Sequence, residues 1–244
     1  MILRVLSFLS LALSLLQASS FGERLTLPIL EVSTQEKHTA YIPSFDLKIG
    51  ESGEILRELA GGHSVIIARA QVVEIKEGRA KITFEKLDSL AQNYFPEPEL
   101  TPQKEDKTLW RTFYDRALLI APSQELYIHV RDSYPQIRWQ HPDLFVSYLL
   151  EEREHAPSRE DFRHICNAYN IGILYIIASG KGEARDCQTF ALLRQDPIAK
   201  DAPKEEQIRP FFSRLGNVEQ SWFNAVFGGA EVKDYYLYYD ELLK

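Results

Sequence analysis

Cys166 and Cys187 are the only cysteines in the chain and the residues best suited to chemistry. In an oxidising compartment two thiols commonly form one disulfide. This one would close a loop of about twenty residues and contribute roughly 3 kcal/mol on the chain-entropy model. Two free buried thiols are an alternative. A metal site is another, since His164 and Cys166 form an H-x-C pair, although zinc sites usually add ligands at C-x-x-C or H-x-x-x-H spacing. The cysteine count favours the Cys166–Cys187 disulfide.

No combination of residues indicates an enzyme. His164 and Cys166 lie two apart on a predicted helix, where side chains point in different directions, so a Cys–His nucleophile is not favoured. Segment 179–182 (SGKG) lacks the earlier glycine and the following Ser or Thr of a phosphate-binding loop. The glycines at 61–62 could form an oxyanion loop, but the sequence has no G-x-S-x-G nucleophile motif that would act with such a loop. None of the six histidines belongs to an H-E-x-x-H string. We predict a noncatalytic protein with no metal and no cofactor.

Residues 1–20 have the three zones of a cleavable secretory signal peptide. Arg4 supplies the positive charge, the run from Val5 to Leu16 is apolar apart from three serines, and Ala18-Ser-Ser20 favours cleavage before Phe21. A retained membrane anchor is the alternative. It needs about twenty apolar residues, whereas this run has about a dozen. No second long apolar run follows, so we expect an exported protein without a transmembrane span after cleavage.

Charge and composition exclude two broad classes. The chain has 28 basic and 35 acidic side chains, a formal net charge of −7, whereas a nucleic-acid surface requires a concentrated basic face. Hydrophobic residues make up 45% of the chain and aromatic residues 11%, which is ample for a packed core, so the chain is not disordered. We expect a soluble, folded protein with no nucleic-acid partner.

The first half of the chain has the pattern of short β-strands. Residues 64–85 are the clearest case, because β-branched and apolar residues alternate with polar ones on both sides of the turn Glu77-Gly78. Such alternation is typical of a hairpin with one buried face. A charged, proline-rich stretch at 96–107 indicates an exposed loop, and 109–113 returns to a strand. We predict a small β-barrel or β-sandwich over residues 21–113.

Helical and strand patterns alternate after residue 113. Residues 117–121, 137–139 and 171–178 are predicted strands, with 187–193 as the hairpin partner of 171–178. Helices are predicted to begin after Ser123 and Ser158, which are suitable N-caps, and to span 142–152, 218–227 and 235–243. In this arrangement Cys166 ends the helix that leads into the strand 171–178, and Cys187 begins its hairpin partner. Both cysteines then lie at related ends of one supersecondary unit, which makes the Cys166–Cys187 disulfide geometrically reasonable. We predict an α/β domain over 114–244, an α+β protein overall, with one intertwined α+β domain as the alternative.

Several short blocks, in order, resemble a known family. They are Ile42-Pro-Ser-Phe-Asp-Leu-Lys-Ile-Gly50, Ser64-Val-Ile-Ile-Ala68, Ala117-Leu-Leu-Ile-Ala-Pro122 with Glu125-Leu-Tyr127, Cys166-Asn-Ala-Tyr169, Gly172-Ile-Leu-Tyr-Ile176, Cys187, Pro210-Phe-Phe-Ser-Arg214 and Tyr238-Tyr-Asp240. Together they resemble the N-terminal domain of the bacterial surface plasminogen-binding protein A (PgbA) family over nearly the whole chain after the signal. Both cysteines stand where the family pattern has them, which strengthens the disulfide prediction.

The resemblance implies a cell-envelope protein of a Gram-negative bacterium, located in the periplasm or on the outer cell surface. Full-length relatives bind host plasminogen and carry a long Lys- and Glu-rich tail, suited to the kringle modules of plasminogen. In this sequence Lys244 stands where the tail of the relatives would follow, and we take it as a candidate C-terminal lysine for kringle recognition. We expect a noncatalytic binding or scaffold protein. The alternatives are a periplasmic structural or assembly protein that does not bind plasminogen and an uncharacterised hydrolase.

Overall fold

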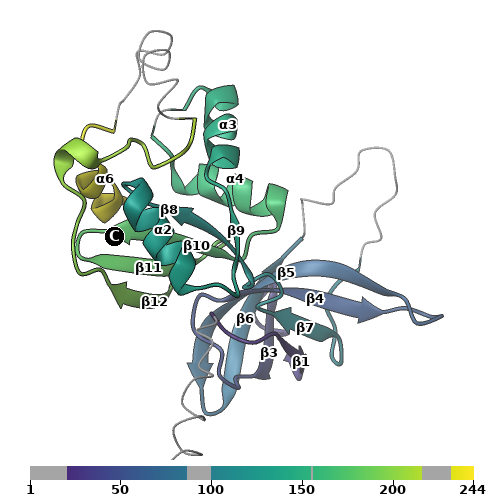
Figure 1. Ribbon diagram of the computed structural model, residues 1–244. Coiled ribbons are helices and arrows are strands. Elements are labelled where there is room, and N and C mark those ends of the chain that lie inside the picture. The colour runs from purple at the N-terminus through teal and green to yellow at the C-terminus, as the bar shows by residue number, and fades with distance from the viewer. Residues whose placement is uncertain (1–20, 87–99, 155, 216–231) are drawn as a thin grey trace, which may run out of the picture.

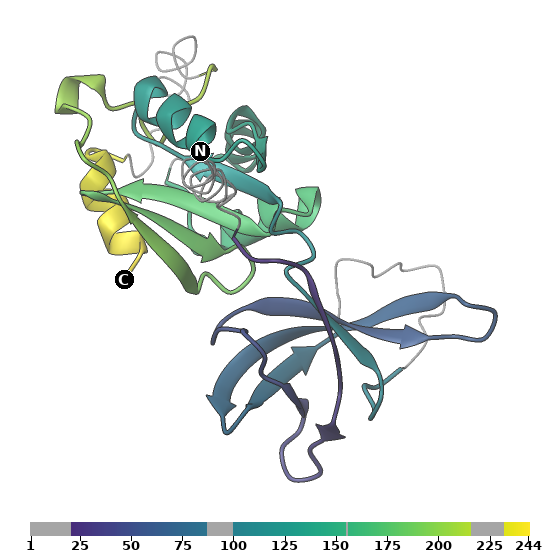
Figure 2. The same cartoon turned by 60° about the horizontal axis from the view of Figure 1, so that its bottom comes forward.

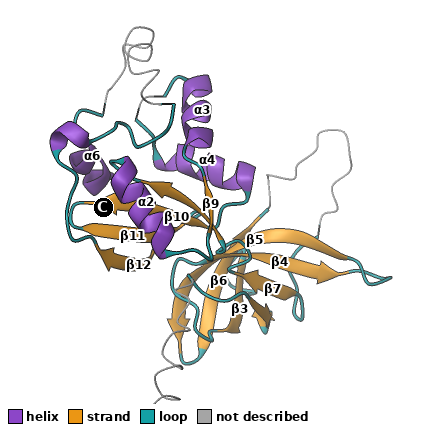
Figure 3. Ribbon diagram, in the orientation of Figure 1, coloured by secondary structure: helices purple, strands orange, loops and turns teal. Residues whose placement is uncertain are grey.

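A computed structural model describes residues 21–86, 100–154, 156–215 and 232–244. The chain forms a seven-stranded antiparallel sheet and then a five-stranded mixed sheet with helices on both faces (Figures 1 and 2). Colouring by secondary structure separates an all-strand region from a mixed region (Figure 3). The predicted α+β class is confirmed. Its division into domains at 21–113 and 114–244 stays a prediction.

The first sheet is strongly curled. Its strand order is β1-β7-β4-β5-β6-β3-β2, so its two edge strands follow one another in the chain. Between them, Ile29 N donates to Asp106 O at 2.8 Å and Leu30 N donates to Tyr41 O at 2.9 Å. Both edges are thus tied to one short segment, and the sheet forms a half-barrel. The strands are β1 (Leu25–Pro28), β2 (Glu31–Val32), β3 (Thr39–Pro43), β4 (Ser52–Glu58), β5 (Ser64–Lys76), β6 (Arg79–Glu85) and β7 (Lys107–Trp110).

The longest hairpin of this sheet follows the predicted pattern. β5 and β6 pair antiparallel around Glu77 and Gly78, both of which have positive φ, as the commonest two-residue hairpin turn requires. Alternate residues of the two strands, such as Val72 and Ile82, are fully buried inside the curl, while the intervening residues face outward. The alternation in the sequence therefore predicted both the turn and the buried face of this hairpin correctly.

The second sheet has the order β12-β11-β10-β8-β9, with β8 parallel to both β10 and β9 and the remaining pairs antiparallel. Its strands are β8 (Arg116–Ile120), β9 (Arg138–Gln140), β10 (Ile173–Ala178), β11 (Lys181–Asp186) and β12 (Leu192–Pro197). The helices are α2 (Gln124–Ser133), α3 (Asp143–Glu152), α4 (Arg159–Tyr169) and α6 (Tyr235–Leu242), with a 3₁₀ turn η2 (Lys204–Glu206).

Strand β10 is the centre of this region, because all six of its residues are buried. Ile173, Tyr175 and Ile177 belong to the core under α2, whereas the residues between them belong to the core under α3, α4 and α6. A strand covered on both faces has a continuous apolar sequence rather than an alternating one. The predicted buried strand at 171–178 is confirmed for this reason.

Helix starts also follow the sequence. Ser123 accepts a hydrogen bond from Leu126 N at the start of α2. Ser158 and Asp161 form a reciprocal capping box at the start of α4, the arrangement that satisfies two otherwise unpaired backbone donors. The tyrosines of α6 are mostly core residues, since Tyr235 and Tyr239 are fully buried.

The predicted hairpin partner of β10 is wrong. Residues 187–193 are mostly a connecting turn, and the partner is β11, which starts directly after Ser179 and Gly180. Strand β11 contains a buried carboxylate, Glu183, which pairs with Lys181 and Arg185 of the same strand. These paired charges hide the apolar alternation by which strands are recognised. Two predictions fall outside the described residues: the signal peptide at 1–20 and the helix at 218–227. Of the predicted exposed loop at 96–107, residues 100–106 are described, have no helix or strand and are mostly exposed.

Candidate functional site

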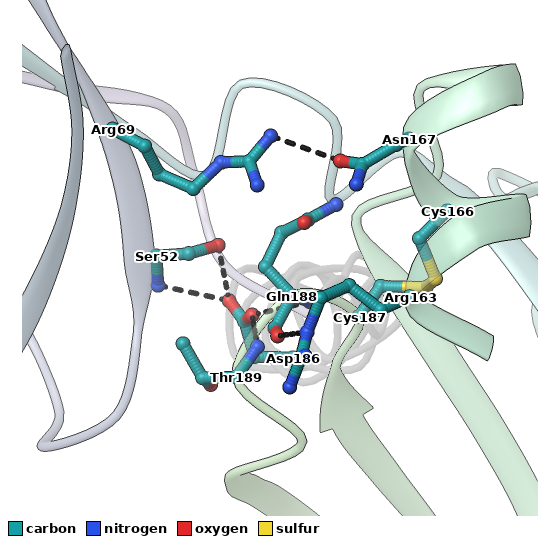
Figure 4. The surroundings of a disulfide bond; sticks show 9 residues. All are labelled: Ser52, Arg69, Arg163, Cys166, Asn167, Asp186, Cys187, Gln188 and Thr189. Carbon is teal, nitrogen blue, oxygen red and sulfur yellow. Dashed lines mark hydrogen bonds between the residues drawn. A yellow bond between two sulfur atoms is a disulfide. The ribbon is translucent and has the colours of Figure 1, made fainter. Parts of the chain in front are cut away.

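The two sheets meet at a buried carboxylate, Asp186, which ends β11 and is fully buried. Its Oδ2 accepts from Ser52 N at 2.9 Å, from Ser52 Oγ at 2.7 Å and from the hydroxyl of Tyr114 at 2.7 Å. Its Oδ1 accepts from Gln188 N at 2.9 Å and Thr189 N at 3.0 Å. In Figure 4, Ser52 of the first sheet lies on one side of Asp186, and Gln188 and Thr189 of the turn after β11 lie beside it. One carboxylate thus joins the two sheets and shapes the turn that follows β11.

The tyrosine at this junction stays protonated. Burial, reinforced by the negative charge of Asp186, raises the pKa of Tyr114 well above its ordinary value. Its hydroxyl therefore remains a hydrogen-bond donor to Asp186 at any physiological pH. The junction is a structural contact of the charge-assisted kind, which is about twice as strong as a neutral hydrogen bond.

Close backbone approaches complete the junction and need glycine at two positions. Gly50 has a positive φ, and a Cβ there would overlap Ala191; its carbonyl also accepts from the Thr189 hydroxyl. Gly172 lies between α4 and β10, where a Cβ would collide with the backbone of Phe113. Glycine is the residue that permits both situations at low cost.

A second ionic cluster lies beside the first. Arg111, held at a positive φ of 59°, donates two hydrogen bonds to Glu51 at 3.0 and 3.1 Å and another to Asp46 at 3.0 Å. Arg111 and Glu51 are both buried. Burial raises the pKa of Glu51 above its ordinary value, and the hydrogen bonds and charge of Arg111 partly offset this. The nearby Glu54, which accepts from the Thr112 hydroxyl at 2.9 Å, also has a pKa raised by burial.

The predicted disulfide fixes the turn after Asp186. Cys166 of α4 and Cys187 are bonded, with their Cα atoms 5.9 Å apart, within the usual range for disulfides. Neither cysteine is free, so the alternatives of free thiols, a Cys–His nucleophile and a cysteine metal ligand are all wrong. The bridge joins α4 to the turn 187–191, which carries two of the hydrogen bonds to Asp186.

A polar groove of about 550 Å³ opens along this junction. A smaller cavity of about 140 Å³ adjoins it and shares Ser52, Arg69 and Gln188. Figure 4 shows Arg69, Arg163 and Gln188 near one another, with the Cys166–Cys187 disulfide to their right. The groove is lined by residues of the half-barrel, by one residue of α4 and by two residues of the turn after β11: Lys37, His38, Ser52, Arg69, Ala70, Gln71, Thr83, Phe84, Glu85, Arg163, Gln188 and Thr189.

The sequence-predicted binding residue, Lys244, is not part of this groove. Its side chain is 72% exposed and its ammonium contacts Glu241, one turn earlier. Arg159 and Arg185 donate to the carbonyls of Leu242 and Leu243, which fixes the end of α6 just before the lysine. The structure therefore presents Lys244 on the surface at the end of an anchored helix.

The sequence did not identify the cations of the groove. Lys37 precedes β3, Arg69 lies in β5 and Arg163 in α4, so no local spacing relates them. Within the described ranges, no group of three or more His, Cys, Asp or Glu side chains is arranged to hold a metal ion. His164 stacks on Tyr148, with ring centroids 4.5 Å apart, and His155 lies outside the described residues. No helix of the described part is long and apolar enough to cross a membrane.

The fold and the junction define a disulfide-bridged α+β protein in which a half-barrel is joined to a mixed sheet through a polar seam. The family described as plasminogen-binding protein PgbA, N-terminal, matches residues 24–243. The chain belongs to this family. It is 29% identical over 242 residues to plasminogen-binding protein PgbA of Helicobacter pylori strain J99 and 28% identical to that of strain 26695. These alignments cover 99% of this chain but 51% of each relative, so the chain spans about half their length. No solved structure matches the chain significantly.

Proposed function

We propose that the chain is an exported, noncatalytic binding module of the bacterial cell envelope and that it binds host plasminogen. The observation that carries the proposal is the family match over residues 24–243, which includes both sheets and the seam between them. Relatives named as plasminogen-binding proteins align over 99% of this chain. The match covers the folded region itself, and binding by this region, without the remaining half of the relatives, is the part of the proposal that the experiment below tests.

Two features support export. Residues 1–20 have the pattern of a secretory signal, and Cys166 is bonded to Cys187. Disulfides form and persist in oxidising compartments such as the periplasm and the cell surface. Protease treatment of intact cells tests the location: a surface protein is digested, whereas a periplasmic one is protected until the outer membrane is opened. Plasminogen capture requires the first result.

Lys244 is the candidate contact for a kringle module. Kringle recognition needs an ammonium and a carboxylate that a pocket can reach, and the exposed side chain of Lys244 offers the ammonium. Its contact with Glu241 is an exposed surface ion pair, and such pairs are weak because solvent screens both charges. Plasminogen can therefore displace this contact at little cost.

The test compares plasminogen binding by the purified protein and by two lysine variants. Lys244→Ala removes the candidate ammonium, and Lys204→Ala is a matched control, because its side chain is 74% exposed and also faces a carboxylate, Asp234. We expect Lys244→Ala to bind at least about ten-fold more weakly, which corresponds to the loss of about 1.4 kcal/mol, and a free lysine analogue to compete with the unmodified protein. Equal affinities of the two variants would contradict the role of Lys244.

The second proposal is a periplasmic structural or assembly protein that does not bind plasminogen. The seam favours it, since buried polar contacts that join two sheets are typical of a rigid scaffold. Protection from protease in intact cells, together with absent plasminogen binding, would establish this alternative. A hydrolase is less favoured, because Cys166 is in a disulfide and Asp186 already accepts hydrogen bonds from Ser52 and Tyr114.

A further inference from the structure

The groove along the seam has the opposite charge to the protein as a whole. Lys37, Arg69 and Arg163 line it, and Glu85 is the only carboxylate among the described residues of its lining. The chain carries a formal net charge of −7. A local excess of positive charge in an acidic protein attracts anions and concentrates them at that place.

None of these three cations forms an ion pair within the described residues, although Glu54 and Glu85 stand opposite Arg69 on the neighbouring strands. Arg69 donates to the amide oxygen of Asn167 at 2.9 Å, and Arg163 donates to the backbone carbonyl of Gln188 at 3.0 Å. The hydrogen-bond acceptors of both guanidinium groups are neutral, and the charge of Arg69 is offset in part by Glu54. Many other cations of the surface differ: Arg79, for example, is paired with Glu31. The groove therefore keeps charge-assisted donors available for a ligand.

The groove also has an acceptor without a donor. The side-chain oxygen Oε1 of Gln188 is buried and has no hydrogen-bond partner among the residues that the structure describes. A buried acceptor in this state costs about 1–3 kcal/mol when no partner satisfies it. Gln188 directly follows Cys187, so the disulfide restrains the backbone that carries this acceptor, and its side chain lies between Arg69 and Arg163 in Figure 4. A ligand that fits must therefore supply N–H or O–H donors as well as negative charge.

We propose that this groove binds an acidic peptide segment of a partner protein. Its carboxylates contact Lys37, Arg69 and Arg163, and one of its backbone N–H groups donates to Gln188 Oε1. The cations come from three separate elements along a groove of about 550 Å³, which suits an extended chain better than a single small anion. The rings of His38 and Phe84, with centroids 5.8 Å apart and planes tilted by 41°, form one wall of the groove. This site is independent of Lys244 and of plasminogen capture.

The experiment uses a fluorescent peptide of alternating glutamate and glycine, titrated with the intact protein and followed by anisotropy. We expect saturable binding that weakens as salt is raised, because salt screens exposed charges. A matched peptide with glutamine in place of glutamate should not bind. Lys37→Gln should weaken binding about two- to five-fold, the range for one exposed charge pair, and Arg69→Gln and Arg163→Gln should weaken it by at least that factor.

The control variant is Arg79→Gln, which removes one positive charge from the same sheet but outside the groove lining. It should bind the peptide like the unmodified protein. Lys37→Gln is the decisive variant, because no described hydrogen bond or ion pair involves its side chain, whereas Arg69→Gln also breaks the contact with Asn167. Circular dichroism confirms that each variant is folded.

Four results would overturn the proposal. The first three are an absence of binding by the unmodified protein, equal binding of the glutamine peptide, and an equal loss of affinity in Arg79→Gln and Lys37→Gln. The fourth is full competition by inorganic phosphate at the concentration of the peptide's carboxylates, which would identify a small-anion site in place of a peptide site.

Discussion

The two sheets of this protein bury their residues in different ways. Along β5 of the first sheet, only alternate residues in the middle of the strand are buried, whereas all six residues of β10 in the second sheet are buried. The half-barrel therefore has a single core inside its curl. The mixed sheet has a core on each face, under α2 on one side and under α3, α4 and α6 on the other.

This difference indicates that the mixed sheet is the more stable half. Burial of apolar area is the main favourable term in folding, and the mixed sheet buries both faces and contains the disulfide. The half-barrel gains part of its order from the seam, through the hydrogen bonds of Ser52 to Asp186 and of Thr189 to the carbonyl of Gly50. The proposed peptide groove is lined by residues of both regions. Lys37 and Arg69 belong to the half-barrel, and Arg163 and Gln188 belong to the mixed region.

Removal of the disulfide gives the largest test of this comparison. Cys166→Ser with Cys187→Ser releases a loop whose ends are 21 residues apart, and we expect the free energy of unfolding to fall by about 3 kcal/mol. Both sulfurs lie in or beside the core of the mixed region. Hydrogen exchange should therefore become faster in β10 and α4 more than in β5 and β6. An equal change in both sheets would show that the two halves unfold as one unit.

Loss of the seam carboxylate tests how the halves are joined. Asp186→Ala leaves the Tyr114 hydroxyl and the Ser52 donors without their acceptor, and we expect a loss of about 2 kcal/mol. The signature is a separate, earlier unfolding of the half-barrel in urea. Asp196→Ala is the matched control: Asp196 also accepts from tyrosine hydroxyls, those of Tyr134 at 2.7 Å and Tyr175 at 2.9 Å, but within the mixed region. A separate transition in both variants would argue against a special role for the seam.

The same contrast explains how much of the structure was predictable from sequence. Alternation and a Glu-Gly turn located the β5–β6 hairpin, a continuous apolar run located β10, and Ser123 and Ser158 located two helix starts. These are local signals. Strand β11 was misplaced because its buried charge, Glu183, is neutralised by neighbours in the same strand, and a charged segment looks like a turn or loop when its partners are not known.

The candidate sites divide in the same way. The disulfide was predictable because two cysteines allow only one pairing. The groove was not, since Lys37, Arg69 and Arg163 are brought together only by the packing of two sheets and a helix, which no spacing in the sequence encodes. Lys244 was named from the resemblance and from its type; its role in binding, like export, stays a prediction.

The smallest expected effect concerns pH and the carboxyl of Glu54 in the half-barrel near the seam. Burial raises its pKa above the ordinary value of 4.5, although the Thr112 hydroxyl and nearby arginines act in the opposite direction. The folded protein thus holds this proton more tightly than the unfolded chain does. Stability from this group is fully present below pH 4.5 and is lost as pH rises through the folded pKa.

Glu54→Gln removes this dependence and keeps an acceptor for Thr112. We expect the variant and the unmodified protein to differ least near pH 4.5, and the variant to become more stable by about 1 kcal/mol or less at neutral pH. Urea unfolding at a series of pH values measures this difference. Thr112→Val should shift the transition to higher pH, because it removes a hydrogen bond that favours the charged form. Parallel pH profiles of Glu54→Gln and the unmodified protein would contradict the expectation and would place the pH sensitivity of the half-barrel at Glu51, whose pKa is also raised by burial.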